Sequence, residues 1–173
     1  SPTTEGKTVF FPSEVSKYPS RSDNFDLYKV LATHQVSHIE FGSFAFQFDR
    51  PSTLFHDIRQ ILLRKMGKNA VTKSSETNRL LKNNIVTDMH RFFEVFEDRN
   101  LALDIFSVIE DGRLDHRTKV EYAGISKAYF NVQSDALTVR PDISSLPAKE
   151  ALVELLVRLS IEDITGLVVP QKY

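Results

Sequence analysis

Two histidines, His34 and His38, are the residues of this chain whose type and spacing best suit chemistry. Side chains four residues apart on a helix lie on one face, so both imidazoles can bind one divalent metal ion. In zinc peptidases with an H-E-x-x-H sequence, the residue after the first histidine is the glutamate that activates water. Here that residue is Gln35, which has no proton to exchange. The spacing therefore predicts a metal site that lacks the general base of a peptidase.

The helix that carries the histidines must turn them toward the protein interior. Its apolar stripe recurs at helical spacing and includes both of them: Leu27, Val30 or Leu31, His34, His38 and Phe41. A buried imidazole needs either a metal ion or a hydrogen-bond partner, because burying an unpaired polar group is costly. The alternative to a metal site is therefore a pair of buried histidines bonded to backbone carbonyls or to a carboxylate. An H-x-x-x-H match can also arise by chance.

A third candidate ligand, Glu110, lies on a helix predicted from about Leu101 to Tyr122. It is spaced by four from Phe106 and from Leu114, so it sits between two apolar side chains on one face. A buried carboxylate is rarely left unpaired, and its partner should be a metal ion, a histidine or an arginine.

Three charged residues follow Glu110: Asp111 and Asp115 lie on an adjacent face, and Arg113 lies nearby. Together with Gln35 they are candidates for orienting the metal ligands or for stabilising the fold. The alternative for the three charged residues is a salt-bridged helix surface.

The composition is that of a folded globular domain. Of 173 residues, 41% are hydrophobic and 26% are charged, which suits one domain with a real core and not a disordered chain. The net charge of −1, with both signs interspersed, gives no basic stripe for nucleic acid. No run of about 18 apolar residues predicts a membrane span. Cysteine is absent, which excludes disulfides and thiolate chemistry and fits a cytoplasmic location.

The periodicity predicts a mainly α fold with about five or six helices. We expect an extended arm and loop over residues 1–22, a helical domain over 23–165 and the start of a linker over 166–173. Helices are predicted from Asp23 or Asn24 to about Glu40 or Phe41, from Asp49 to Gly67, from Ser74 or Ser75 through Phe96, from Leu101 to Tyr122, and after Pro147. The last helix should bury Ala151, Leu152, Leu155, Leu156 and Leu159. The polar stretch from Gly124 to Ser145 is predicted to be irregular. The alternating aromatics from Phe41 to Phe48 suit a brief strand or a loop. The abrupt start and end lead us to expect a piece of a longer protein.

Several segments resemble, in the same order, those of the NorD and CbbO proteins. The segment Tyr28–Gly42 resembles their histidine-bearing helix. Ile109–Asp115 is similar to their E-D-x-R-hydrophobic-D segment, and Glu121–Ile125 to the turn after it. Pro147–Ser160 resembles the helix before their linker. The resemblance covers most of Val9 to Ile161. The NorD and CbbO proteins are large cytoplasmic adaptors that carry a von Willebrand factor A domain near their C-terminus.

This resemblance implies a partnership with a hexameric AAA+ ATPase of the MoxR type, in which the ring supplies force and the adaptor recognises a client enzyme. CbbO-type adaptors serve Rubisco activation by releasing inhibitory sugar phosphates, and NorD-type adaptors serve nitric-oxide-reductase maturation. The chain has no D-x-S-x-S motif, so it would be the helical region upstream of the A domain. The client is left open between Rubisco and nitric oxide reductase.

Two histidines on one helix and a glutamate on a later one are also similar to the gluzincin pattern. By that analogy His34, His38 and Glu110 would bind zinc. Because Gln35 cannot serve as the base, the leading hypothesis is a non-catalytic adaptor domain built on a degenerate zincin-like helix pair. The alternatives are a zinc-dependent metallopeptidase-like domain with an unusual base and a helical module of an unrelated system.

Overall fold

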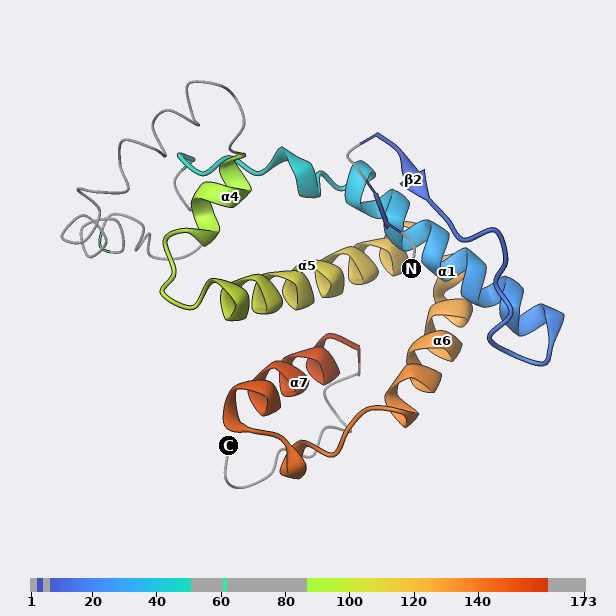
Figure 1. The fold of residues 1–173 in the computed structure, drawn as a ribbon. Coiled ribbons are helices and arrows are strands. Elements are labelled where there is room, and N and C mark those ends of the chain that lie inside the picture. The colour runs from blue at the N-terminus through green and yellow to red at the C-terminus, as the bar shows by residue number, and fades with distance from the viewer. Residues whose placement is uncertain (1–2, 5–6, 51–60, 62–86, 162–173) are drawn as a thin grey trace. The chain divides into compact units, whose positions relative to one another are not determined.

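The computed structural model describes residues 3–4, 7–50, 61 and 87–161. Within them the protein is mainly helical, as predicted, with five α-helices, three short 3₁₀ helices and one two-stranded sheet (Figure 1). The chain divides into two compact units. Ser1–Phe44 and Asp104–Tyr173 form the first unit, and Ala45–Leu103 forms the second.

Helix α1, Arg21–Glu40, carries both histidines. It begins after Ser20, whose hydroxyl accepts hydrogen bonds from two backbone N–H groups of the first turn. The predicted caps, Asp23 and Asn24, were therefore placed too late, because the serine already satisfies these N–H groups. Gly42 ends the helix as predicted, with a φ of 74° that glycine adopts without steric cost.

Helix α5, Arg99–Glu121, agrees closely with its predicted range. Its fully buried residues, Leu114 and Thr118, lie on one face. The Thr118 hydroxyl is 2.7 Å from the hydroxyl of Ser37, which is also buried on α1. A satisfied polar pair of this kind in a core fixes how the two helices align.

Helix α6, Ser126–Thr138, corrects the prediction that residues 124–145 are irregular. Its apolar residues pack on α1 in one cluster that comprises Val30, Ile125, Ala128, Tyr129 and Val132. The cluster residues from Ile125 to Val132 recur at helical spacing, and polar residues between them obscured the pattern. Burial against α1 therefore stabilises a helix that propensity alone did not indicate.

Helix α7 spans Ala148–Ile161, directly after the proline predicted to open it. Ala151 and Leu155 are buried as predicted. The prediction is wrong for Leu152 and Leu159, which are 52% and 42% exposed. The buried face of the helix is therefore narrower than its leucine content suggested.

A buried carboxylate occupies part of that face instead. Glu154 accepts hydrogen bonds from Arg140 Nε at 2.7 Å and Nη2 at 2.5 Å, and from Arg158 Nε at 3.0 Å. The pair with Arg140 holds α7 to the segment that follows α6, and both arginines compensate the burial of the charge.

The N-terminal arm contributes the sheet. Strands β1, Thr3–Thr4, and β2, Val9–Phe10, pair antiparallel, with Thr3 opposite Phe10. This confirms the extended segment predicted at the N-terminus. Next to β2, the ring of Phe11 lies 5.6 Å from that of Tyr28, so the arm packs on α1.

The second unit contains helix α4, Asp88–Phe93, capped by the hydroxyl of Thr87.

The aromatic stretch from Phe41 to Phe48 forms a loop with a 3₁₀ turn at Ser43–Ala45, which is one of the two predicted alternatives. Most of the helices predicted for residues 49–67 and 74–96, and the linker predicted at 166–173, lie outside the described residues. In the described part of the chain, the helices are all too short or too polar to span a bilayer.

Candidate metal centre

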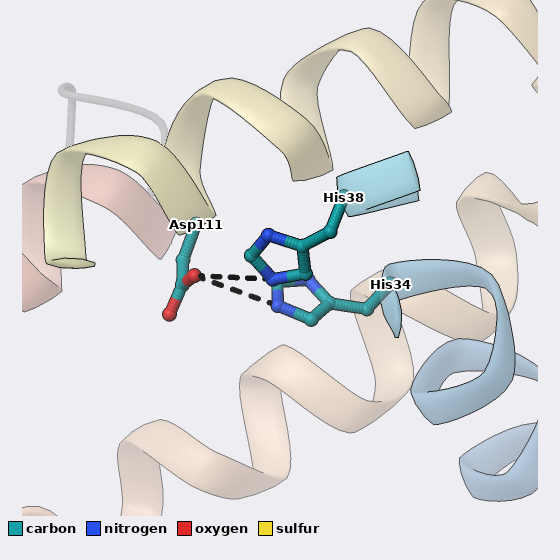
Figure 2. A group of neighbouring side chains, drawn as sticks. All are labelled: His34, His38 and Asp111. Carbon is teal, nitrogen blue, oxygen red and sulfur yellow. Dashed lines mark ion pairs between the residues drawn. The ribbon is translucent and has the colours of Figure 1, made fainter. Parts of the chain in front are cut away.

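Helices α1 and α5 bring His34, His38 and Asp111 together (Figure 2). One potential ligand atom from each residue lies within 4.8 Å of the other two. Asp111 Oδ1 is 3.6 Å from Nε2 of His34 and 3.9 Å from Nε2 of His38. Ligand atoms around tetrahedral zinc lie about 3.3 Å apart, given bonds of roughly 2.0–2.1 Å. Small side-chain movements would therefore let these three residues, the metal triad, bind one ion.

The second ring nitrogen of His34 has a partner of its own. Its Nδ1 lies 2.8 Å from Oδ1 of Asp115. A neutral imidazole that donates Nδ1–H to this carboxylate keeps a lone pair on Nε2, the atom that faces Asp111. Metal-binding histidines are commonly held in this way, by a carboxylate on the nitrogen that does not bind the metal.

The second ring nitrogen of His38 is also engaged. Its Nδ1 lies 3.1 Å from Oγ of Ser43, and the serine hydroxyl donates to Glu110 Oε1 at 2.5 Å. Because the serine donates its proton to Glu110, its oxygen is free to accept Nδ1–H from the imidazole. His38 Nε2 thereby keeps its lone pair and, like that of His34, faces Asp111.

Glu110, the third ligand predicted from the sequence, has other partners. Arg113 donates to it through Nε at 2.7 Å and Nη2 at 2.6 Å. The hydrogen bonds from Arg113 and Ser43 lower the pKa of Glu110 in spite of its burial. An arginine was one of the partners expected for this carboxylate. Ligation by Glu110 stays a prediction, and the geometry favours Asp111.

The charges of the triad are uneven. Burial opposes protonation of His34, but hydrogen bonds with Asp111 and Asp115 outweigh it and raise the pKa of His34 from 6.5 to about 9. Burial lowers the pKa of His38, and the nearby His34 lowers it further. At neutral pH without metal, His34 therefore carries the positive charge and His38 is neutral.

The remaining predicted residues, Arg113 and Gln35, lie outside the triad. Besides Glu110, Arg113 Nη2 donates to the backbone carbonyl of Phe41 at 3.2 Å, which ties the end of α1 to α5. Gln35 is half-buried on α1. Being adjacent to His34, it lies about 100° away around the helix.

Helix α6 also contributes a residue close to the triad. The sequence did not indicate this contribution, because that segment was predicted to be irregular. Gln133 Nε2 donates to Oδ2 of Asp115 at 2.8 Å. One signal for the carboxylates was present in the sequence. Asp111 and Asp115 are spaced by four on a helix, which is the spacing of the two histidines, and such pairs can face each other across two helices.

Comparisons of the chain with models of protein families, with curated proteins and with solved structures found no match. The resemblance to NorD and CbbO proteins therefore enters below as a proposal.

Proposed function

We propose that this chain is a non-catalytic, cytoplasmic helical domain that binds one zinc ion between α1 and α5. One observation carries the metal proposal: His34 and His38 direct Nε2 at the same oxygen of Asp111, and each uses Nδ1 to bond the protein. Simple buried histidines need only one partner each. A carboxylate that faces the second nitrogen of both rings supplies a third ligand, which supports a metal ion between the three side chains.

The ligand set favours zinc. Two imidazoles and one carboxylate are a usual zinc set, with a fourth position for water, whereas magnesium and calcium prefer all-oxygen ligands. Iron, nickel and copper also bind imidazole, so the identity of the ion needs measurement. Elemental analysis of the purified chain, followed by zinc titration, tests this directly.

The variants for that titration follow from the geometry. His34→Ala and His38→Ala should abolish stoichiometric zinc binding. His116→Ala is the matched control, since His116 lies exposed on α5. Equal zinc binding by all four proteins, the wild type included, would refute the proposed site.

Several features argue against hydrolysis. A zinc-bound water needs a base to accept its proton, and Gln35 replaces the glutamate that performs this step in zinc peptidases. The two nearby carboxylates are engaged: Asp115 with His34 and Gln133, and Glu110 with Arg113 and Ser43. A metal ion here would therefore stabilise the architecture.

The molecular role that we propose is that of a NorD- or CbbO-like adaptor. It would work with a MoxR-type AAA+ ATPase hexamer to remodel or activate a client enzyme, either Rubisco or nitric oxide reductase. The support is the ordered resemblance of the segments from Tyr28 to Gly42 and from Ile109 to Asp115, together with the arguments against catalysis. Co-purification of the chain with a MoxR-type ATPase tests the partnership. Absence of binding, in a chain whose folding is verified by circular dichroism, would refute it.

The second candidate is a zinc-dependent metallopeptidase-like domain. It is favoured by the ligand set itself, because two histidines and one carboxylate also form the sites of zinc peptidases. Peptide cleavage that requires added zinc and disappears in His34→Ala would establish this candidate and refute the purely architectural role.

A further inference from the structure

Helix α6 is connected to the metal triad by the carboxylate of Asp115, which lies on α5. Asp115 bonds His34 Nδ1 with Oδ1 and Gln133 Nε2 with Oδ2, both at 2.8 Å. The direction of the His34 ring, and hence of its ligand atom, depends on this carboxylate. A side chain of α6 holds the other oxygen of the same group.

A second residue of α6, Tyr129, lies beside Asp115 and buries its hydroxyl. Tyr129 precedes Gln133 by one helical turn and is fully buried, with 0% exposure. Within the described residues its hydroxyl has no hydrogen-bond partner. Burial raises the pKa of Tyr129, and the charge of the adjacent Asp115 raises it further. Buried hydroxyls without partners are uncommon in folded proteins.

We propose that Tyr129 and Gln133 are positioning residues for the metal, acting through Asp115 on His34. The inference rests on the proposed metal site. A carboxylate has about four lone-pair sites, and two of those on Asp115 are occupied, so it can accept the Tyr129 hydroxyl as well. An ion on His34 Nε2 fixes the ring and, through Nδ1–H, fixes Asp115. The Tyr129 hydroxyl can then donate a hydrogen bond to the fixed carboxylate of Asp115, in addition to those from His34 and Gln133.

This inference makes an unusual combination of predictions for one variant, Tyr129→Phe. Without metal, the variant should melt at the same temperature as the wild type or higher, because the hydroxyl that it loses is unpaired. Its zinc affinity should fall by roughly 10-fold or more, the range for partners that orient metal ligands. Competition with a chromophoric chelator measures this affinity.

A second variant and a control complete the experiment. Gln133→Met keeps the length of the side chain but removes the donor to Asp115, so it should also weaken zinc binding by roughly 10-fold. Tyr18→Phe is the matched control, since the hydroxyl of Tyr18 bonds Asp135 instead. It should bind zinc like the wild type.

The visible spectrum of bound Co²⁺ separates positioning from general destabilisation. Tyr129→Phe and Gln133→Met should change its band positions or intensities, and Tyr18→Phe should not. Unchanged zinc affinity and cobalt spectrum in both α6 variants would overturn the inference while leaving the metal site intact. If Tyr129→Phe fails to fold, Gln133→Met alone decides. A wild-type chain that binds no metal would overturn both proposals.

Discussion

The two histidines of the metal triad hold protons differently, and zinc binding should reveal the difference. His34, with a pKa raised to about 9 by its two carboxylates against the effect of burial, is protonated at pH 7 in the metal-free chain. Zinc must displace this proton, so binding at pH 7 should release about one proton, and the affinity should rise with pH toward 9. Calorimetric titration in two buffers of different ionisation enthalpy measures the release. Binding without proton release would exclude His34 as a ligand.

Single substitutions should also distinguish which of two neighbouring carboxylates, Asp111 or Glu110, binds zinc. Asp111→Asn should weaken zinc binding by roughly 100-fold, since an amide oxygen is a poorer ligand than the carboxylate facing both histidines. Glu110→Gln should change zinc affinity only a few-fold and should instead destabilise the metal-free chain, because Arg113 loses its charged partner. Parallel titrations and melting curves of the two variants test this. The reverse order of affinities would establish Glu110 as the ligand.

The sequence could identify the helix that carries the two candidate histidines but not the carboxylate that faces both of them. Spacing on α1 placed His34 and His38 on one face, and their apolar neighbours indicated burial. On α5, the apolar neighbours of Glu110 indicated burial, and its side chain is partly buried, with 15% exposed. They could not indicate that Arg113 would pair with it. Nor could they indicate that Asp111, 52% exposed, would face the histidines of another helix.

Helices α5 and α7 approach each other at a glycine. A Cβ atom added to Gly112 would lie 2.9 Å from Cβ of Ser160, closer than such atoms approach in proteins. Gly112→Ala should therefore cost about 1–3 kcal/mol, as other overpacking substitutions do. Gly124→Ala is the matched control, because nothing lies within 4 Å of its added Cβ. Equal urea midpoints for the two variants would contradict the close approach.

The buried carboxylate of Glu154 on α7 should make the stability of the folded chain sensitive to acid. Burial favours protonated Glu154, but the hydrogen bonds from Arg140 and Arg158 outweigh it and lower the pKa of Glu154 below 4.5. A group whose pKa is lower in the folded state stabilises that state above its unfolded pKa. This contribution is lost as the pH falls through the folded value.

Glu154→Gln should therefore destabilise the chain at pH 7 by roughly 1–3 kcal/mol, since both arginines are partly exposed and lose their partner. Its stability should also decline less than that of the wild type between pH 5 and pH 3, a range set by the lowered pKa of a group with an ordinary pKa near 4.5. Urea unfolding at several pH values measures both effects. Parallel acid profiles for the variant and the wild type would exclude Glu154 as the acid-sensitive group.

The helices were predictable where their ends carry strong local signals. Gly42 and Pro147 marked two boundaries, and the apolar spacing from Leu101 to Tyr122 marked α5. Helix α6 escaped because its stability comes from packing on α1, which a local pattern does not contain. The burial of Glu154 was not predicted for a related reason: it depends on Arg140, which the fold brings to Glu154, as well as on Arg158 one turn later in the same helix.

At the scale of the molecule, the proposed ion would join segments of the first unit that lie far apart in the sequence. It would bind the folded form and not the unfolded chain, so at a free zinc concentration of 100 times its dissociation constant it should stabilise the fold by about 2.7 kcal/mol. For a chain of this length, that corresponds to a melting temperature higher by roughly 5–11 °C. Calorimetry with zinc and with a chelator measures the shift, and His34→Ala should abolish it.

The site of this stabilisation can be located by hydrogen exchange. All three residues of the triad belong to the unit formed by Ser1–Phe44 and Asp104–Tyr173. Zinc should therefore slow amide exchange in α1, in α5 from Asp104 onward and in α6, whose Gln133 holds Asp115. It should leave α4, Asp88–Phe93, unchanged, because that helix belongs to the other unit. Protection that appears equally in α4 would mean that zinc acts elsewhere than at His34, His38 and Asp111. Protection confined to α1 and α5 would support the metal triad but contradict the positioning role of α6.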